Sequence, residues 1–209
     1  MKITMAEYSH NQIRKMWRSC LSKLEIIPGV GIGNIYFGMT REEVDKILGP
    51  GNNRDWSHVG TGFPKEWISV YYADFIVEFF ENKVVGIEVF ADVLSEDNET
   101  RLPVFLHGIS LFEEKAEDVV KKLEQYTPCV HILNDVYGAG DKDLATEYEF
   151  DDMGVALWRE DGFHTKLLSS PQFLQENEEE QEYLKQRLYF DAVYLYIPHE
   201  RNKYFNNKE

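Results

Sequence analysis

The chain has 209 residues, of which 43% are hydrophobic and 14% aromatic, and this much apolar material excludes a wholly disordered chain. The 22 Lys and Arg residues stand against 37 Asp and Glu, and the resulting net charge of −15 disfavours nucleic acid and favours basic partners. The first 25 residues carry +3 and the remainder −18, so the acidic character belongs to the body of the chain.

Targeting and redox features predict a cytoplasmic protein. No apolar run approaches the ~18 residues of a membrane span, so we expect no membrane association. Arg14, Lys15 and Arg18 interrupt the N-terminal stretch that could serve as a signal peptide, and we expect no secretion signal. Cys20 and Cys129 lack metal-ligand or redox spacing and are expected to be reduced thiols.

Residues 1–28 are predicted to contain an amphipathic N-terminal helix, over residues 5–24. Its apolar residues recur at spacings of three and four, namely Ile13, Met16, Trp17, Cys20, Leu21 and Leu24. The opposite face is basic, and we expect this helix to pack on its own domain rather than on a membrane.

Residues 29–102 are predicted to form a first unit with one helix followed by antiparallel strands. After a Gly-rich turn and a short strand, Thr40 and Glu43 form a capping box that starts a helix over residues 40–48. Aromatic and β-branched residues dominate three later segments, which predicts strands at residues 67–72, 75–80 and 84–90.

Residues 103–198 are predicted to form a second unit of the same order, followed by a polar tail at 199–209. Its expected elements are an extended lead-in at 104–112, a helix at 113–126, strands at 146–150 and 154–158, an acidic helix at 172–188 and a final strand at 190–197. The unit resembles the first: REEVDKIL at 41–48 aligns with AEDVVKKL at 116–123, and FENKVVGI at 80–87 with FDDMGVAL at 150–157. The predicted fold class is therefore α+β, built from two consecutive helix-then-antiparallel-sheet units.

Motifs for catalysis, cofactors and metals are weak. Gly29, Gly31 and Gly33 lead into a strand instead of opening a helix, which favours a tight turn over a dinucleotide site. The six histidines show no metal-ligand spacing. Cys129 and His131 would share one face of a strand, yet a buried structural thiol is the simpler interpretation. We predict no catalytic, cofactor or metal site.

Partner-binding residues are predicted from strand alternation. If Tyr148 and Phe150 point to the core, Glu147 and Glu149 point outward, and Glu78 and Glu88 hold comparable positions in the first unit. The predicted partner-binding residues are Glu78, Glu88, Glu147, Glu149, Asp151, Asp152 and Trp158. An ordinary amphipathic sheet is an equally good interpretation of this pattern.

The stretch GNIYFGMTREEVDKILGPG at 33–51 resembles the repeating unit of small bacterial domains typified by the β-lactamase inhibitor protein and the small outer-membrane assembly lipoprotein. The matching residues are Gly38, Met39, Thr40, Glu43, Val44, Leu48, Gly49 and Pro50. The resemblance implies two tandem units whose sheets form a concave, non-enzymatic protein-binding surface. The second unit lacks the Gly-Met-Thr, and no cysteine pair lies within either unit.

We therefore expect a non-enzymatic protein-binding module that acts on a basic protein, in the manner of an immunity protein that inhibits a basic bacterial toxin. Two alternatives stay open. One is a hydrolase with a pocket between the two units, and the other is a structural or regulatory subunit that buries the N-terminal helix against a partner. The sequence leaves the oligomeric state open.

Overall fold

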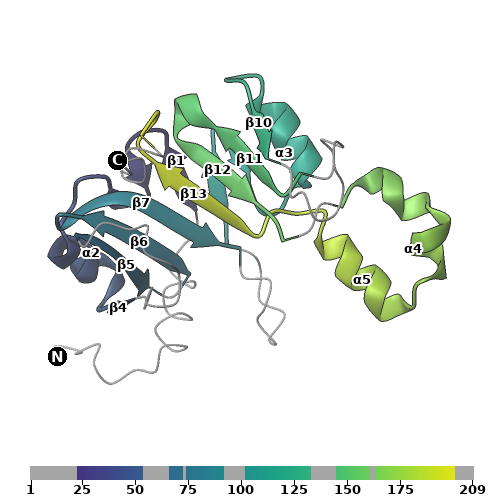
Figure 1. Cartoon of the computed structure of the whole chain (residues 1–209), viewed down its shortest axis with the longest axis horizontal. Coiled ribbons are helices and arrows are strands. Elements are labelled where there is room, and N and C mark those ends of the chain that lie inside the picture. The colour runs from purple at the N-terminus through teal and green to yellow at the C-terminus, as the bar shows by residue number, and fades with distance from the viewer. Residues whose placement is uncertain are drawn as a thin grey trace, which may run out of the picture.

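A computed structural model describes residues 23–53, 66–72, 74–91, 102–132, 145–160 and 163–200. An eight-stranded antiparallel sheet with the strand order β10-β11-β12-β13-β7-β6-β5-β4 forms the centre of the molecule (Figure 1). A smaller five-stranded sheet has the order β3-β2-β1-β8-β9. Helices and largely antiparallel sheets together make an α+β fold, which confirms the predicted fold class.

The first half of the large sheet is an antiparallel meander. Glu81 and Asn82 join its last two strands, and their φ angles of +49° and +60° give a two-residue turn that matches the strand twist. The strands predicted at 67–72 and 75–80 are confirmed. The elements of the first half of the chain, of which β4 to β7 belong to the large sheet, are β1 (Leu24–Ile27), β2 (Gly31–Ile32), β3 (Ile35–Tyr36), α2 (Arg41–Leu48), β4 (Asn52–Asn53), β5 (Trp67–Tyr72), β6 (Phe75–Phe80) and β7 (Lys83–Phe90).

Helix α2 begins where the capping box predicts. The Thr40 side chain accepts a hydrogen bond from the Glu43 backbone N–H, and the Glu43 carboxylate accepts one of 2.7 Å from the Thr40 N–H. The Tyr72 hydroxyl donates to Asp45 Oδ1 at 2.7 Å and so ties the helix to β5. Burial first, and then this contact with Asp45, raise the pKa of Tyr72.

The second half repeats the order hairpin, helix and four antiparallel strands. Helix α3 is shorter than the predicted 113–126. Its N-cap is Lys115 and its C-cap is Glu124. A strand that was not predicted, β10, follows it directly. The elements are β8 (Val104–Leu106), β9 (Ile109–Ser110), α3 (Ala116–Leu123), β10 (Val130–Ile132), β11 (Glu147–Phe150), η3 (Asp151–Met153), β12 (Val155–Trp158) and β13 (Ala192–Tyr196).

The two halves meet at the antiparallel pair β7 and β13, where Ile87 lies opposite Leu195. Both side chains belong to one hydrophobic core cluster, which also takes in the apolar faces of α2, α3 and the small sheet. The small sheet also joins them, through the parallel pair β1 and β8. The two predicted halves therefore share both sheets and one core.

The strand order equates β4 to β7 with β10 to β13. The aligned segments 41–48 and 116–123 coincide with α2 and α3. The alignment of 80–87 with 150–157 is displaced by one strand, because it matches the turn after β6 with the turn after β11. Both turns carry acidic residues between an aromatic residue and a hydrophobic strand, so local sequence does not separate them.

The strands β12 and β13 are connected by residues 159–191, which we call the arm. Figure 1 shows the arm projecting beyond the end of the sheet. It contains η4 (Thr165–Ser169), α4 (Pro171–Gln175) and α5 (Glu178–Gln186). The single helix predicted at 172–188 is wrong, because Asn177 accepts a hydrogen bond of 2.9 Å from the Glu180 N–H and caps a second helix. Leu174 on α4 and Tyr183 on α5 are 63% and 45% exposed, so these two helices leave large apolar side chains at the surface.

The predicted N-terminal helix, residues 5–24, is wrong at its C-terminal end. Leu24 starts strand β1, which pairs in parallel with β8 and antiparallel with β2. The alternating burial of Leu24 and Ile26 fits a strand, and the pairing that stabilises it comes from a segment about 80 residues away in the chain. Residues 5–22 of the predicted helix lie outside the described residues. Within the described ranges, no helix has the length and apolarity needed to cross a membrane.

Candidate functional site: the distal face of the large sheet

The large sheet has a core face and a second face, which we call the distal face. Side chains on a strand alternate between the two faces, so residues between core-cluster members lie on the distal face. The distal face comprises Trp67, Ser69, Tyr71, Ile76, Glu78, Phe80, Gly86, Glu88, Phe90, Val130, Glu147, Glu149, Ala156, Trp158, Ala192, Tyr194 and Tyr196.

The predicted alternation of β11 is confirmed. Tyr148 and Phe150 are buried in the core cluster, whereas Glu147 and Glu149 are partly exposed on the distal face. The distal face is therefore acidic on β11, a strand near one edge of the sheet.

Gly86 lies at the centre of the distal face, where a carboxylate and a tyrosine meet above it. The Tyr194 hydroxyl donates a hydrogen bond of 2.6 Å to Glu78 Oε2. A Cβ atom at Gly86 would lie 2.5 Å from both of these oxygen-bearing groups. The absence of a side chain at Gly86 thus lets β13 and β6 interact across β7.

A second tyrosine–carboxylate pair extends toward the other half. The Tyr196 hydroxyl donates to Glu149 Oε1 at 3.0 Å, and its ring stacks on that of Tyr194 with 5.9 Å between centroids. One strand, β13, therefore orients a carboxylate from each half of the sheet. These two tyrosines were not among the predicted partner-binding residues, although alternation within FDAVYLYI places both on one face.

The other predicted residues of the distal face lie beside this centre. Glu88 on β7 is the register partner of Tyr194. Glu147 is the register partner of Trp158, which is 42% exposed. The four predicted glutamates and Trp158 are thus brought onto one face, on β6, β7, β11 and β12.

Asp151 and Asp152 lie apart from that face, in η3 at the end of β11. His199 Nδ1 is 2.8 Å from Asp151 Oδ2. Asp152 Oδ2 accepts a hydrogen bond of 2.6 Å from the Thr127 hydroxyl, which connects the turn to the segment after α3. These two aspartates stabilise the end of the sheet and are not part of the distal face.

Two buried arginines hold the base of the arm. Arg159 is 2% exposed and donates to the carbonyl oxygens of Ala145 and Phe163 at 2.9 and 2.7 Å, and to the Tyr148 hydroxyl at 2.8 Å. Burial lowers the pKa of Arg159. Its contacts join the arm to β11 and the segment before it, so the arm leaves the sheet in a defined direction.

Arg187 forms the second contact at this base. Its Nη2 is 2.6 Å from Glu160 Oε2, its guanidinium carbon lies 4.3 Å from the centroid of the Tyr183 ring, and it also donates to the Tyr183 hydroxyl. Both arginines combine a partner four residues away, Phe163 for Arg159 and Tyr183 for Arg187, with partners from more distant segments. The distant partners are not evident from sequence spacing, so the burial of these arginines was not predicted.

The thiol of Cys129 is poorly suited to nucleophilic catalysis. Burial first, and then the charges of Glu124 and Glu149, raise the pKa of Cys129 to about 12, so the reactive thiolate is scarce at neutral pH. The side chain of His131, which would pair with Cys129 in the hydrolase alternative, lies outside the described residues.

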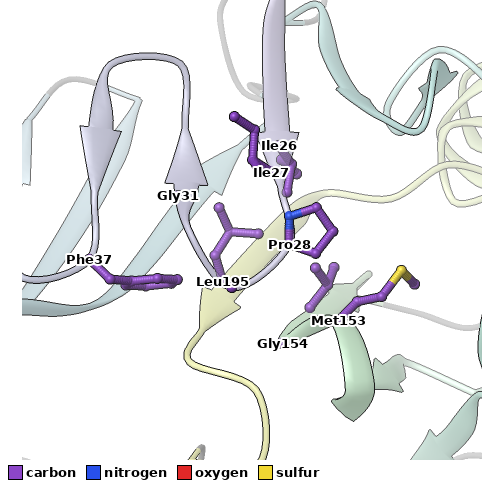
Figure 2. Close-up of a pocket in the computed structure, with 10 residues that line it drawn as sticks. Ile26, Ile27, Pro28, Gly31, Phe37, Met153, Gly154 and Leu195 are labelled. Atoms are coloured by element: carbon purple, nitrogen blue, oxygen red, sulfur yellow. The ribbon is translucent and has the colours of Figure 1, made fainter.

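A pocket between the two halves is small and apolar. It has a volume of about 140 Å³, below the ~300 Å³ of typical ligand sites. Figure 2 shows Ile26, Pro28 and Phe37 from the first half facing Met153 and Leu195 from the second. None of its lining side chains is titratable, so this pocket supplies no acid, base or nucleophile for a hydrolase.

Among the described residues, no group of three or more His, Cys, Asp or Glu side chains is arranged to hold a metal ion. Comparisons with family models, with curated proteins and with solved structures found no match to this chain. The interpretation of function therefore rests on the distal face.

Proposed function

We propose that the protein is a non-enzymatic module whose distal face binds a basic protein. The observation that supports this proposal is the joint placement of four glutamates, Glu78, Glu88, Glu147 and Glu149, on one continuous sheet face with the partly exposed Tyr71, Tyr194 and Trp158. Carboxylates accelerate encounter with a basic partner, and aromatic side chains supply most of the binding energy once contact is made. The net charge of −15 acts in the same direction.

The partner in this proposal is a basic bacterial toxin such as a nuclease, and the module is its immunity-type inhibitor in the cytoplasm. The sequence resemblance to tandem-unit inhibitory domains and the acidic body of the chain support this choice. The interface spans both halves, because β13 orients Glu78 of the first half and Glu149 of the second.

Matched charge variants test the proposal. Glu88→Gln with Glu147→Gln removes two carboxylates from the distal face while leaving both tyrosine–carboxylate pairs intact. Glu178→Gln with Glu179→Gln removes the same charge from exposed positions on α5. We expect a basic protein to co-purify with the wild-type chain and the α5 variant at low salt, and to be lost with the distal-face variant and at high salt. Equal capture by both variants would contradict the proposal.

A further inference from the structure

Trp158 is the most exposed tryptophan side chain among the described residues of the distal face, at 42%. It ends β12, directly opposite Glu147 on β11 and Ala192 on β13. Tryptophan is enriched at protein interfaces, because its ring supplies a large apolar area and its N–H a polar end.

An indole ring beside a carboxylate suits the guanidinium of arginine better than the ammonium of lysine. Cβ atoms of directly opposite residues in an antiparallel pair are about 5 Å apart, so a cation stacked on Trp158 lies within reach of Glu147. A guanidinium is planar and weakly hydrated, and it stacks on an aromatic face while donating to a carboxylate. A lysine ammonium is a compact, strongly hydrated charge that makes the same pair of contacts less well.

The chain itself holds an arginine in this manner close by. Arg187 lies over the Tyr183 ring and pairs with Glu160 at 2.6 Å, and Glu160 is two residues from Trp158. Arg159 lies 5.5 Å from the centroid of the Tyr148 ring and donates to its hydroxyl. At this end of the sheet, Arg159 and Arg187 are thus each held by an aromatic ring together with oxygen acceptors.

We propose that Trp158 and Glu147 bind an arginine side chain of the basic partner, and that the distal face therefore selects arginine over lysine. This inference rests on the proposed function, and it names the side chain that is recognised. Charge attraction alone would bind arginine and lysine equally well. A preference for arginine would therefore come from Trp158 and Glu147.

Two peptides of equal length and charge test the inference, one with arginine and one with lysine alternating with glycine. Their affinities for the full chain are measured by isothermal titration calorimetry at low ionic strength. We expect the arginine peptide to bind about threefold to tenfold more tightly, as a cation–π contact at a partly exposed site predicts. Trp158→Leu should abolish the preference and Glu147→Gln should reduce it. Glu179→Gln, which removes an equal charge from α5, should preserve it.

The possible outcomes separate the two proposals. Equal, salt-sensitive binding of both peptides would overturn the arginine inference and leave the charge-driven function standing. A preference that survives both Trp158→Leu and Glu147→Gln would also overturn it, because the selective site would lie elsewhere. Binding of neither peptide at low salt would overturn the inference and would remove the charge attraction on which the proposed function depends. Circular dichroism of each variant checks that the fold is retained.

Discussion

The two halves of the large sheet join equivalent strands by connections of very different length. In the first half, Glu81 and Asn82 alone join β6 to β7, whereas the arm of residues 159–191 joins β12 to β13 in the second. The sheet accommodates both because the strands are stabilised by their neighbours and by the shared core, and loop length adds only a small entropic cost. The comparison shows that two residues are enough to make the connection that the arm makes, and that the contacts at the base of the arm fix where it leaves the sheet.

The helices of the two halves differ in a similar way. Helices α2 and α3 occupy the same position in each half, yet α2 starts with a complete capping box and α3 starts at Lys115 without a side-chain cap. Helix α3 instead buries four residues, against two in α2. Local hydrogen bonding therefore contributes more to the first helix and packing more to the second.

The largest expected effect tests whether the halves form one cooperative unit. Ile87→Ala and Leu195→Ala each remove a buried side chain from opposite strands of the join, and each should lower the free energy of unfolding by about 3 kcal/mol. Urea unfolding followed by tryptophan fluorescence and by circular dichroism should give one coincident transition. Two separate transitions would show that the halves are independent. The double variant should be non-additive, since the two side chains are neighbours.

The next effect concerns the base of the arm. Arg159→Met leaves the carbonyl oxygens of Ala145 and Phe163 without this donor, and we expect a loss of about 2–3 kcal/mol in unfolding free energy. Lys185→Met removes the same charge from an exposed position of the arm and should change stability by less than about 0.5 kcal/mol. Limited proteolysis should cut the arm faster in the Arg159 variant only. Equal stability of the two variants would show that Arg159 does not hold the arm.

A smaller effect separates the two helices. Thr40→Ala removes the capping hydrogen bond of α2 and should cost about 1 kcal/mol. Lys115→Ala, at the matching position before α3, removes no capping bond and should cost much less. Denaturant midpoints of the two variants make this comparison, and equal losses would contradict the assigned roles of the two residues.

The smallest expected effect is a slower rate of chemical labelling at Cys129. Because burial raises the pKa of Cys129 to about 12 from an ordinary value of 9.0, its thiolate is suppressed in the folded chain and recovers in the unfolded one. In a Cys20→Ser background, iodoacetamide should label Cys129 at pH 8 at least about tenfold more slowly in the folded chain than in urea. The stability that this group contributes is present below pH 9 and is lost as the pH rises toward 12. Rapid labelling of the folded chain would reveal an accessible, reactive thiol.

Much of the local structure follows from short segments of sequence. Thr40 and Glu43 predict the start of α2, and alternation predicts β5, β6 and the outward direction of Glu147 and Glu149. Predictions failed where a neighbour in space decided the outcome, or where a local helix cap was missed. Leu24 joins a strand because β8 lies beside it, and the long acidic helix is interrupted because Asn177 caps α5.

The amino-acid sequence by itself determined the fold class, the capped helix and the alternating carboxylates, because turns, caps and strand periodicity depend on residues a few positions apart. Tertiary structure alone decided that β7 pairs with β13, that Tyr194 and Tyr196 orient carboxylates from both halves, and that Trp158 stands opposite Glu147. These features depend on which strands become neighbours. Strand order is set by the packing of the whole core, and no local pattern encodes it.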